Sequence, residues 1–349
     1  MKASTSTNIF RVRSKPNDEN LVRKWDALLD QSLYATQYTA KEYFDEILHK
    51  AGSALAIIAE SSDCVSFILT GRKQGNTLSF GATGSPQFIF RKDSFSDPSV
   101  AKELSEHLLA AARETRCEII TIYSWESIPE FRKHGFVERI CTPPLGTILI
   151  DLTRQKEALF KDFSATTRNR IRRASKQGTE IMRLDIEKDF DEYFALYLAW
   201  SAMKGLPHND YEIQRKAFLN TKNRLVLAAK HDGKIIGVST FRFRQPGMVE
   251  YSANVSRKED SIHKQNDLLL WSALEWATDS GNFKVFSMAG SHFYLSKFGG
   301  IHKSTYEYKK DITTLKFHRI SDNIKRSIFN IYRSLPIGLR NFLKNIAQR

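Results

Sequence analysis

Two segments decide the fold: LSEHLLAAARETRCEIITIYSWESIPEFRKHGFVE (residues 104–138) and LLWSALEWATDSGNFKVFSMAGSHFYLSKFGGIHK (residues 269–303). Laid over each other, they keep one offset, 269 minus 104 or 165 residues, without a gap. Each begins with apolar residues at spacings of three and four, the pattern of an amphipathic helix. Each then passes through a polar turn, an apolar strand and a short aromatic-containing segment to a glycine. The match predicts an internal repeat; two unrelated α/β segments are the alternative.

β-rich stretches precede both predicted helices. They are ALAIIAE, CVSFILTGRK and NTLSFGA (54–60, 64–73 and 76–82) in the first half, and RLVLAAK, KIIGVSTFRFR and MVEYSANV (224–230, 234–244 and 248–255) in the second. The Gly and Pro turns between these runs predict antiparallel hairpins. Further helices are expected at 19–30, 41–49, 155–176 and 190–203. We therefore expect an α/β (α+β) protein with two similar domains, each a mixed, mostly antiparallel sheet flanked by helices.

The length of the chain agrees with two domains, because 349 residues exceed what one hydrophobic core usually organises. The expected boundary lies at Pro143, Pro144 and Gly146, which break regular structure. The sequence thus divides into a first domain at 1–144, a second at 145–312 and a basic, amphipathic helical tail at 313–349.

The charge balance points to an anionic partner. Lys and Arg number 53 against 39 Asp and Glu, a formal net charge of +14. Nucleic acid, a membrane surface and a phosphorylated small molecule all fit this charge. Cys64, Cys117 and Cys141 form no CxxC pair, so no metal site is expected, and their sparse use fits a reducing compartment. Without a signal-like or membrane-spanning apolar run, we expect a cytoplasmic chain.

Three stretches resemble a known family. Two of them resemble the second domain of the FemA/FemB/FemX peptidoglycan-bridge aminoacyltransferases. The start of that domain is similar to GTILIDLTRQKEALFKDFSATTRNRIRRASKQGTEI (146–181). Its end is similar to LLLWSALEWATDSGNFKVFSMAG with KFGG (268–290 and 297–300). FRKHGFVE (131–138) resembles the closing element of a GNAT acyltransferase domain. The resemblance covers most of 10–312. It implies two tandem GNAT-like domains, the second of them catalytic, that transfer an acyl group to an amine.

The basic stretch TRNRIRRASKQG (167–178) contains five cations and no acid. Its apolar side continues a stripe that predicts a buried helix face, made of Phe160, Phe163, Thr167, Ile171 and Ala174. The candidate anion-binding residues are Arg168, Arg172 and Lys176, spaced four apart, with Arg173 beside them. Guanidinium groups suit phosphate or tRNA backbone oxygens. The alternative is a solvated face whose charges suit the end of the helix dipole.

The acyl donor is expected to be aminoacyl-tRNA or acyl-CoA, with no permanently bound cofactor. Acyl-CoA users of the GNAT fold have a glycine-rich turn whose backbone N–H groups hold pyrophosphate at a helix start. The matching stretch here, SRKEDSIHKQNDLL (256–269), has no glycine, although Arg257 and Lys264 could contact phosphates. The missing glycine favours a donor of the Fem type.

The candidate catalytic residues are Lys297 and Tyr251. In the Fem family a Phe-Lys pair precedes the Phe-Gly element, and the matching positions here are Tyr294 and Leu295. Lys297 is the nearest cation and is the expected oxyanion stabiliser; a plain exposed lysine is the alternative. Tyr294 is retained as a substrate-binding candidate.

The strand MVEYSANV (248–255) supplies further substrate-binding candidates. Strict alternation would place Glu250, Ser252 and Asn254 on one face, opposite Tyr251 and Ala253. The resemblance places this strand along the substrate groove, while an ordinary amphipathic strand is the alternative. In the irregular loop expected at 201–212, the resemblance adds His208 and Tyr211 as acceptor-binding candidates.

The tail changes character after residue 312. Its apolar stripe is formed by Ile320, Ile324, Ile328, Ile331 and Leu335. From Lys316 onward the chain is rich in Lys and Arg and has one acid, Asp322. This pattern predicts peripheral contact of 316–349 with anionic membrane; packing of the stripe on the protein itself is the alternative.

These features lead to an expected function. The chain is expected to be an N-acyltransferase that moves an activated acyl or aminoacyl group to an amine of a cell-envelope precursor, either peptidoglycan or polysaccharide. One alternative is an acyl-CoA-dependent GNAT N-acetyltransferase that acts on a nucleotide sugar or polysaccharide. A second is a non-catalytic nucleic-acid-binding protein.

Overall fold

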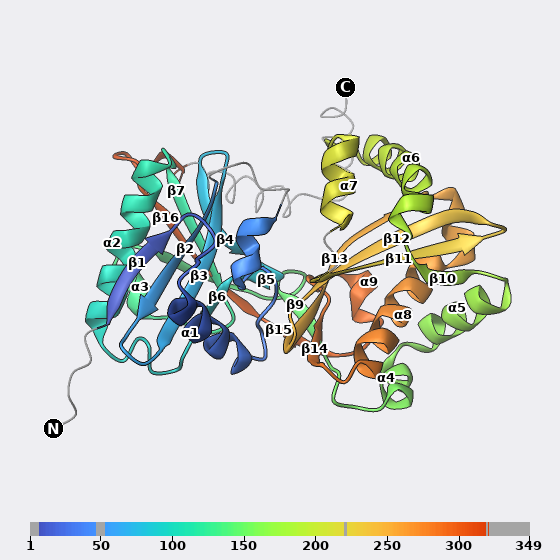
Figure 1. Ribbon diagram of the computed structural model, residues 1–349, viewed down its shortest axis with the longest axis horizontal. Coiled ribbons are helices and arrows are strands. Elements are labelled where there is room, and N and C mark those ends of the chain that lie inside the picture. Colours follow the sequence, from blue (N-terminus) through green and yellow to red (C-terminus); the bar gives the residue numbers. More distant parts are fainter. Residues whose placement is uncertain (1–6, 47–52, 220–221, 319, 321–349) are drawn as a thin grey trace, which may run out of the picture.

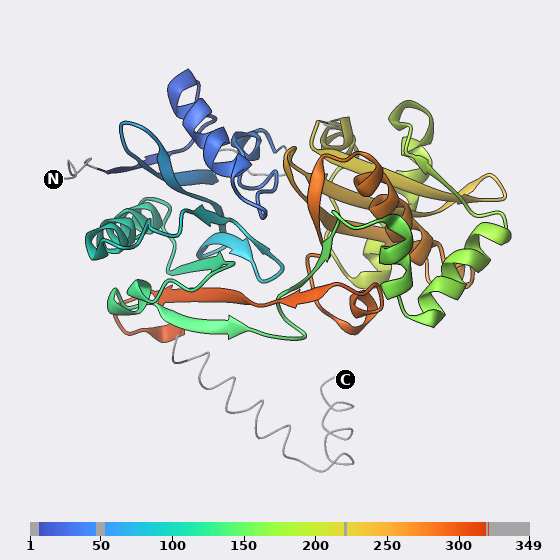
Figure 2. The ribbon, with the colours of Figure 1, turned by 90° about the horizontal axis from the view of Figure 1, so that it is seen from below.

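The structure is a computed structural model that describes residues 7–46, 53–219, 222–318 and 320. Its helices and strands form two lobes side by side along the long axis, each built on one sheet (Figures 1 and 2). This confirms the predicted fold class of two mixed sheets flanked by helices.

The first lobe contains a sheet in the order β1-β2-β3-β4-β7-β16-β8, with β5 and β6 paired to β4 and β3. Its strands are β1 (Asn8–Val12), β2 (Ala54–Glu60), β3 (Val65–Gln74), β4 (Thr77–Ala82), β5 (Ser85–Pro86), β6 (Phe88–Phe90), β7 (Ile119–Ser124), β8 (Val137–Cys141) and β16 (Thr305–Asp311). Its helices are α1 (Glu19–Asp30), η1 (Lys41–Asp45), α2 (Pro98–Glu114) and α3 (Glu130–Lys133). Alternate β2 residues face α1 and α2, so apolar residues cover both faces of the sheet.

The second lobe contains a sheet in the order β10-β11-β12-β13-β14-β9-β15. Its strands are β9 (Thr147–Asp151), β10 (Glu180–Arg183), β11 (Arg224–His231), β12 (Lys234–Phe243), β13 (Gly247–Ser256), β14 (Phe283–Ser287) and β15 (Ile301–Lys303). Its helices are α4 (Lys156–Asp162), α5 (Ala165–Lys176), α6 (Ile186–Lys204), α7 (Tyr211–Leu219), η2 (Glu259–His263), α8 (Gln265–Asp279) and α9 (Phe293–Ser296). Helices α5 and α8 cover one face, and α6 and α7 cover the other.

The chain crosses between the lobes twice. It leaves the first sheet after β8 and enters the second at β9, and it returns from β15 to β16. Strand β16 pairs with both β7 and β8 in the first sheet. The second domain expected from the sequence, 145–312, includes this strand, whereas its hydrogen bonds join it to the sheet of the first lobe. The polar and aromatic alternation of β16 suits either sheet, and the sequence alone does not reveal its partner.

Two local predictions are wrong. The single helix expected at 155–176 breaks into α4 and α5, because Phe163 is extended and Ser164 caps α5 by accepting a hydrogen bond from the Thr167 backbone N–H at 3.2 Å. The loop expected at 201–212 is shorter, because α6 continues to Lys204 and α7 begins at Tyr211. The predicted buried stripe is correct for Phe163, Thr167, Ile171 and Ala174, whereas Phe160 is only partly buried.

In the described part of the chain, each lobe has one parallel strand pair, whose second strand follows the helix of a repeated segment. Strands β4 and β7 pair from Thr77 and Ile119 to Phe80 and Ile122. Strands β13 and β14 pair from Gly247 and Phe283 to Glu250 and Ser287. Past these positions the two strands no longer pair, and we call each point of separation a fork. The halves predicted from the repeat thus share one arrangement of helix, strand and fork.

The predicted membrane-binding tail falls almost wholly outside the described residues, which end at residue 320. Among the helices that the structure describes, none is both long and apolar enough to cross a bilayer.

Candidate functional site

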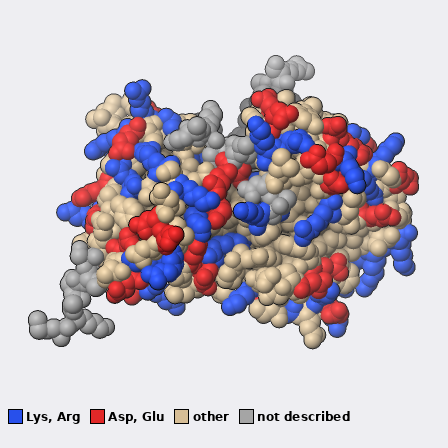
Figure 3. Space-filling model, viewed as in Figure 1, with Lys and Arg blue, Asp and Glu red and all other residues tan. Residues whose placement is uncertain are grey.

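The fork of the second lobe opens into a cavity of about 550 Å³ between the lobes, the fork cavity. Its second-lobe walls include Arg242, Glu250, Tyr251, Ser252 and Ala289. Its first-lobe walls include Tyr38, Tyr43, Glu46, Arg72 and the turn between β4 and β5. In surface view, basic side chains gather along the junction of the lobes, with acidic ones among them (Figure 3). The cavity is therefore polar and is built by both lobes.

A β-bulge shapes the cavity wall. Thr240 pairs with Ala253 and Phe241 with Tyr251, so Ser252 has no partner in β12. The bulge shifts the alternation by one residue, and Glu250 and Asn254 consequently lie on opposite faces of β13. The prediction that Glu250, Ser252 and Asn254 share a face is therefore wrong. Glu250 and Ser252 line the cavity, while Asn254 binds Ser239 and Asn266 through hydrogen bonds of 2.9 and 3.1 Å.

Glu250 is the most unusual group in the cavity. It is the last β13 residue paired to β14, and its side chain is 2% exposed. Burial raises its pKa to about 7, against opposing effects of the Ser85 hydroxyl and Arg242. The Ser85 hydroxyl, which comes from the first lobe, donates to Glu250 Oε2 at 2.7 Å. A carboxyl group with a pKa near neutrality can take up and release a proton under ordinary conditions.

A buried ionic cluster lies beside Glu250 and joins the lobes. Arg242, the cross-strand neighbour of Glu250, is ion-paired to Glu46 of the first lobe. Arg224 reaches the same carboxylate at 3.3 Å, and its own burial lowers its pKa to about 10. Arg242 also lies over the ring of Tyr38, 5.6 Å from its centroid. One carboxylate thus serves two guanidinium groups, and the cluster fixes the position of Arg242 next to Glu250.

The turn between β4 and β5 abuts the fork directly. A Cβ atom on Gly84 would overlap the backbone carbonyl of Ala289, so only glycine permits this approach. Ala289 itself has a positive φ of 51°, just beyond β14. The first lobe therefore closes one side of the fork through backbone contact.

The catalytic candidates Lys297 and Tyr251 occupy different places. Tyr251 lines the fork cavity and packs on Phe241. Lys297 Nζ lies over the rings of Tyr294 and Phe293, 5.0 and 5.5 Å from their centroids. It is not among the residues that line the cavity. The structure thus separates the two candidates, and the role of each stays a prediction.

The substrate candidate Tyr294 belongs to a second polar cluster at the first turn of α8. Its hydroxyl donates to Asp267 at 2.7 Å, and Arg170 approaches the same carboxylate at 3.8 Å. Burial raises the pKa of Asp267, with Tyr294, Arg170, Lys297 and Lys264 opposing it. Burial likewise raises the pKa of Tyr294. Tyr294 thus has an internal partner, and Asp267 was not predicted from the sequence.

The predicted anion row on α5 is divided. Arg168 donates to the carbonyl oxygens of Lys161, at 2.8 Å, and Phe163, so it holds the corner between α4 and α5. Arg172 lies over the Phe160 ring at 5.3 Å and, with Lys176, lines a shallow groove of about 900 Å³ between α5 and α8. Arg173 is exposed outside that groove. The predicted row is therefore divided between a structural contact at Arg168 and the groove that contains Arg172 and Lys176, and its role in anion binding stays a prediction.

The acceptor candidates His208 and Tyr211 lie beside the cavity rather than in it. Tyr211 donates to Asp191 at 2.5 Å, and His208 is exposed. Asn209, between them, does line the fork cavity. The roles of His208 and Tyr211 in acceptor binding stay predictions.

The start of α8 is an unusual helix terminus. Lys264 precedes it with φ at 57°, the left-handed conformation that glycine usually provides, and no side chain caps the helix. The stretch 256–269 therefore forms a turn with positive φ without glycine. The missing glycine is consequently no longer a reason to favour a donor of the Fem type. Within the described part of the chain, no group of three or more His, Cys, Asp or Glu residues could hold a metal ion.

Several site residues were not predicted, namely Tyr38, Glu46, Ser85, Arg242 and Asp267. Arg242 had a usable signal, since it is a cation inside the apolar strand sequence KIIGVSTFRFR. The others come from the first lobe or from a helix turn, and only the packing of the lobes brings them to Glu250 or Tyr294.

Comparison with known proteins yields no matching protein-family model and no matching curated protein. Solved structures do share the fold. FemX aligns with a TM-score of 0.64 at 12% identity, over 86% of this chain and 98% of that one. A tandem GNAT protein from the clavulanic acid biosynthesis pathway aligns with a TM-score of 0.58 at 12% identity, over 88% and 99%.

The third comparison is the C-terminal domain of a protein from Agrobacterium fabrum named as a lysylphosphatidylglycerol synthetase. It aligns with a TM-score of 0.53 at 13% identity, over 88% of this chain and 96% of that one. At such identities the likeness establishes the fold. The chain therefore has the tandem-GNAT fold of FemX, as its sequence resemblance implies.

Proposed function

We propose that the chain is an N-acyltransferase whose reaction takes place at the fork of the second lobe. The observation that carries the proposal is Glu250, a buried carboxyl group with a pKa raised to about 7 in the wall of the fork cavity. The likeness to FemX and to a tandem GNAT protein supports the reaction class.

Glu250 is suited to be the general base. The nitrogen of an amine acceptor attacks the acyl carbon, and a proton of the amine passes to the Glu250 carboxylate. The ester or thioester bond then breaks, and the leaving oxygen or sulfur takes up one proton, which Glu250 can return, so that the products are an amide and a free alcohol or thiol. A base is most useful when its pKa lies near the working pH, and positioned proton transfer contributes roughly 10²–10⁴ in rate. No covalent intermediate on the protein is needed, because the acyl group arrives activated.

The backbone of β13 is suited to stabilise the oxyanion. Beyond Glu250, the β14 side of β13 has no paired strand, so its backbone N–H groups on that side are not used in the sheet. The bulge at Ser252 adds a residue without a β12 partner. One preorganised oxyanion donor contributes roughly 3–4 kcal/mol to the transition state.

The acceptor we propose is an amine on a cell-envelope precursor, of peptidoglycan or polysaccharide. The walls of the fork cavity are rich in hydroxyl, amide and ionic groups, which suits a hydroxylated or peptide-like molecule. The resemblance of 146–181 and 268–300 to the FemA/FemB/FemX family supports the same class. We place the reaction in the cytoplasm, with 316–349 touching the inner face of the membrane; this placement rests on the sequence alone.

The acyl donor we propose is aminoacyl-tRNA. Arg172 and Lys176, in the groove between α5 and α8, are the basic residues best placed to meet its backbone. The second candidate is an acyl-CoA-dependent N-acetyltransferase that acts on a nucleotide sugar or polysaccharide. The uncapped start of α8 favours this candidate, since free backbone N–H groups there can bind pyrophosphate.

The test is the variant Glu250→Gln, which removes the base and preserves size. The assay offers acetyl-CoA or aminoacyl-tRNA as the donor, and an amine of a peptidoglycan precursor or of a nucleotide sugar or polysaccharide as the acceptor. We expect kcat to fall roughly 10²–10⁴-fold. The donor that supports wild-type turnover decides between the two candidates. The matched control is Glu307→Gln on β16 of the first lobe, a carboxyl that is 15% exposed and lines neither the fork cavity nor the groove between α5 and α8. Full activity of Glu250→Gln would refute the proposal.

A further inference from the structure

The first lobe reaches Glu250 through the turn between β4 and β5. Ser85, the first residue of β5, extends across the junction of the lobes, and its hydroxyl donates to Glu250 Oε2 at 2.7 Å. Among the described residues, no other group donates a hydrogen bond to the Glu250 carboxyl group. The carboxyl group in the wall of the second lobe is thus held by a side chain of the first.

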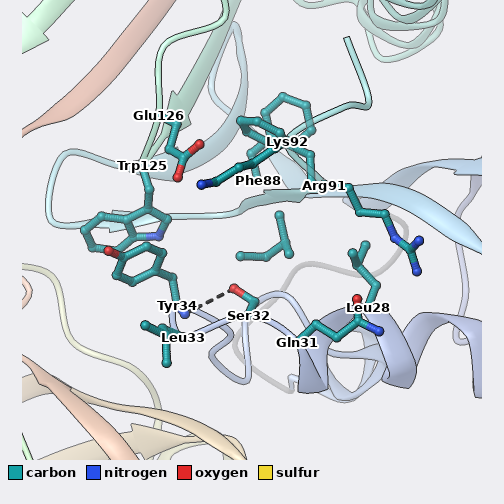
Figure 4. Close-up of a pocket in the computed structure, with 12 residues that line it drawn as sticks. Leu28, Gln31, Ser32, Leu33, Tyr34, Phe88, Arg91, Lys92, Trp125 and Glu126 are labelled. Carbon is teal, nitrogen blue, oxygen red and sulfur yellow. Dashed lines mark hydrogen bonds between the residues drawn. The ribbon is translucent and has the colours of Figure 1, made fainter. Parts of the chain in front are cut away.

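The first lobe also has a cavity of its own, which does not take part in this contact. That cavity encloses about 480 Å³ where β6 and β7 end beside the loop after α1, and the stacked rings of Tyr34 and Trp125 belong to its wall (Figure 4). It shares no lining residue with the fork cavity. The first lobe therefore contacts Glu250 through the turn and not through this cavity.

Contacts from both lobes fix the turn that contains Ser85. In the second lobe, the backbone carbonyl of Ala289 lies so close to Gly84 that a Cβ atom there would overlap it. In the first lobe, the buried Thr305 hydroxyl at the start of β16 donates to the carbonyl oxygen of Thr83 at 2.8 Å. Strand β5 also pairs with β4. A turn supported in this way keeps a hydroxyl group in a fixed place.

The two oxygens of the Glu250 carboxyl group have different surroundings. Oε2 accepts the Ser85 hydroxyl, whereas Oε1 accepts no hydrogen bond from the described residues. Oε1 nevertheless keeps exposed surface, unlike buried polar atoms without a partner such as Gln265 Oε1. Glu250 lines the fork cavity. A carboxylate with one oxygen held and the other open can accept a proton from an amine in a defined geometry.

The other ionisable groups near Glu250 do not hold its carboxyl group. Arg242 of β12, which is ion-paired to Glu46, and Tyr38 of the first lobe are close enough to interact with its charge. Neither forms a hydrogen bond or an ion pair with the carboxyl group in the part of the chain that the structure describes. The orientation of the carboxyl group therefore depends on the Ser85 hydroxyl.

We propose that Ser85 is a positioning residue of the transferase, whose hydroxyl holds Glu250 Oε2 and leaves Oε1 to the acceptor amine. The inference rests on the function proposed above, because it takes Glu250 as the general base. A hydrogen bond donated to a carboxylate favours its charged form, and the Ser85 hydroxyl accordingly lowers the pKa of Glu250 against the effect of burial. The first lobe thus completes the site of the second.

The test compares Ser85→Ala with the wild type in two measurements on the full chain. The first is the pH dependence of kcat/KM, with acetyl-CoA or aminoacyl-tRNA as the donor, whichever the wild type uses. Its midpoint should rise by about one pH unit, because the carboxylate loses a charge-assisted hydrogen bond. The maximal rate should fall roughly tenfold, because the base is less well oriented. The second is the ¹³C NMR titration of the Glu250 carboxyl signal, identified by its absence in Glu250→Gln, whose midpoint should rise equally.

Two further variants separate positioning from a loss of structure. Ser85→Thr keeps the hydroxyl, so both midpoints should stay near those of the wild type. Ser105→Ala on α2 removes a buried hydroxyl that donates to the Ala101 carbonyl oxygen at 2.8 Å, and it should also leave both midpoints unchanged. Unmoved midpoints in Ser85→Ala, in a chain that transfers acyl groups, would overturn this inference alone. Absence of acyl transfer by the wild type would instead overturn the proposed function, and this inference with it.

Discussion

The two lobes share a parallel strand pair and its fork, but they fill the fork differently. In the second lobe, β13 separates from β14 after Glu250, and the fork opens into the fork cavity. In the first lobe, β4 separates from β7 after Phe80, and β6 takes the place of β4 beside β3. A third strand thus fills the fork that lies open in the other lobe.

The residues at the two forks and at the starts of the helices α2 and α8 also differ between the lobes. The last paired residue before the fork is a fully buried Phe80 in the first lobe and the ionisable Glu250 in the second. Helix α2 is capped by the Asp97 side chain and begins with Pro98, whereas α8 has no side-chain cap and follows Lys264. The first lobe has stabilising groups where the second has groups that can bind or react. A repeated unit can therefore support a site in one copy and rigidity in the other.

The largest expected effect is on the filled fork. Phe80 is completely buried in the core shared by β4, β7 and α2, so Phe80→Ala should destabilise the protein by about 3–5 kcal/mol. Urea unfolding measures this change. Glu250→Gln, at the matching place in the open fork, is the comparison and should cost far less at neutral pH. A loss below about 1 kcal/mol in Phe80→Ala would mean that the first fork is not tightly filled.

The next effect concerns the pH dependence of stability. Folding raises the pKa of Glu250 from 4.5 to about 7, so the folded chain holds this proton more tightly than the unfolded chain does. Its contribution is full below pH 4.5 and is lost as the pH rises through 7, a change of about 3 kcal/mol. Unfolding of the wild type and Glu250→Gln at pH 4.5 and pH 8 should show this difference. Parallel pH curves for the two proteins would contradict it.

The sequence predicts the helices and strands of both lobes better than it predicts the candidate site. Periodicity located nearly every long helix and strand, and α1 and β2 match their expected bounds, because alternating and three-four apolar patterns are local. Strand β16 was missed as a first-lobe element, since strand order depends on contacts far apart in the sequence. Short strands such as β10 and β15 have too few residues to show a pattern.

The site was harder to predict for a related reason. Glu250 is a predicted groove residue, but its raised pKa comes from burial in the folded chain, where Ser85 of the other lobe contacts it, and no local pattern contains this. The bulge at Ser252 also reversed the expected face of Asn254, because one extra residue inverts a period of two. Arg168 appeared to be a ligand-binding cation, although its donors satisfy the free carbonyl oxygens at the end of α4.

The smallest expected effect separates backbone strain from ligand binding at the start of α8. Lys264, before α8, and Arg116, before β7, are both cations with positive φ, 57° and 53°, one in each lobe. Glycine adopts this conformation without strain, so Lys264→Gly and Arg116→Gly should each stabilise the protein by about 1 kcal/mol or less. Chemical unfolding measures this gain.

Only Lys264→Gly should also weaken binding of the phosphate-containing donor, by several-fold, because α8 has no side-chain cap at its start, whereas α2 is capped by Asp97. Donor affinity of the two variants, measured at low ionic strength, therefore tests the contrast between the lobes directly. Equal losses in both variants would indicate a general effect of net charge, and they would mean that the starts of α8 and α2 do not differ in donor binding.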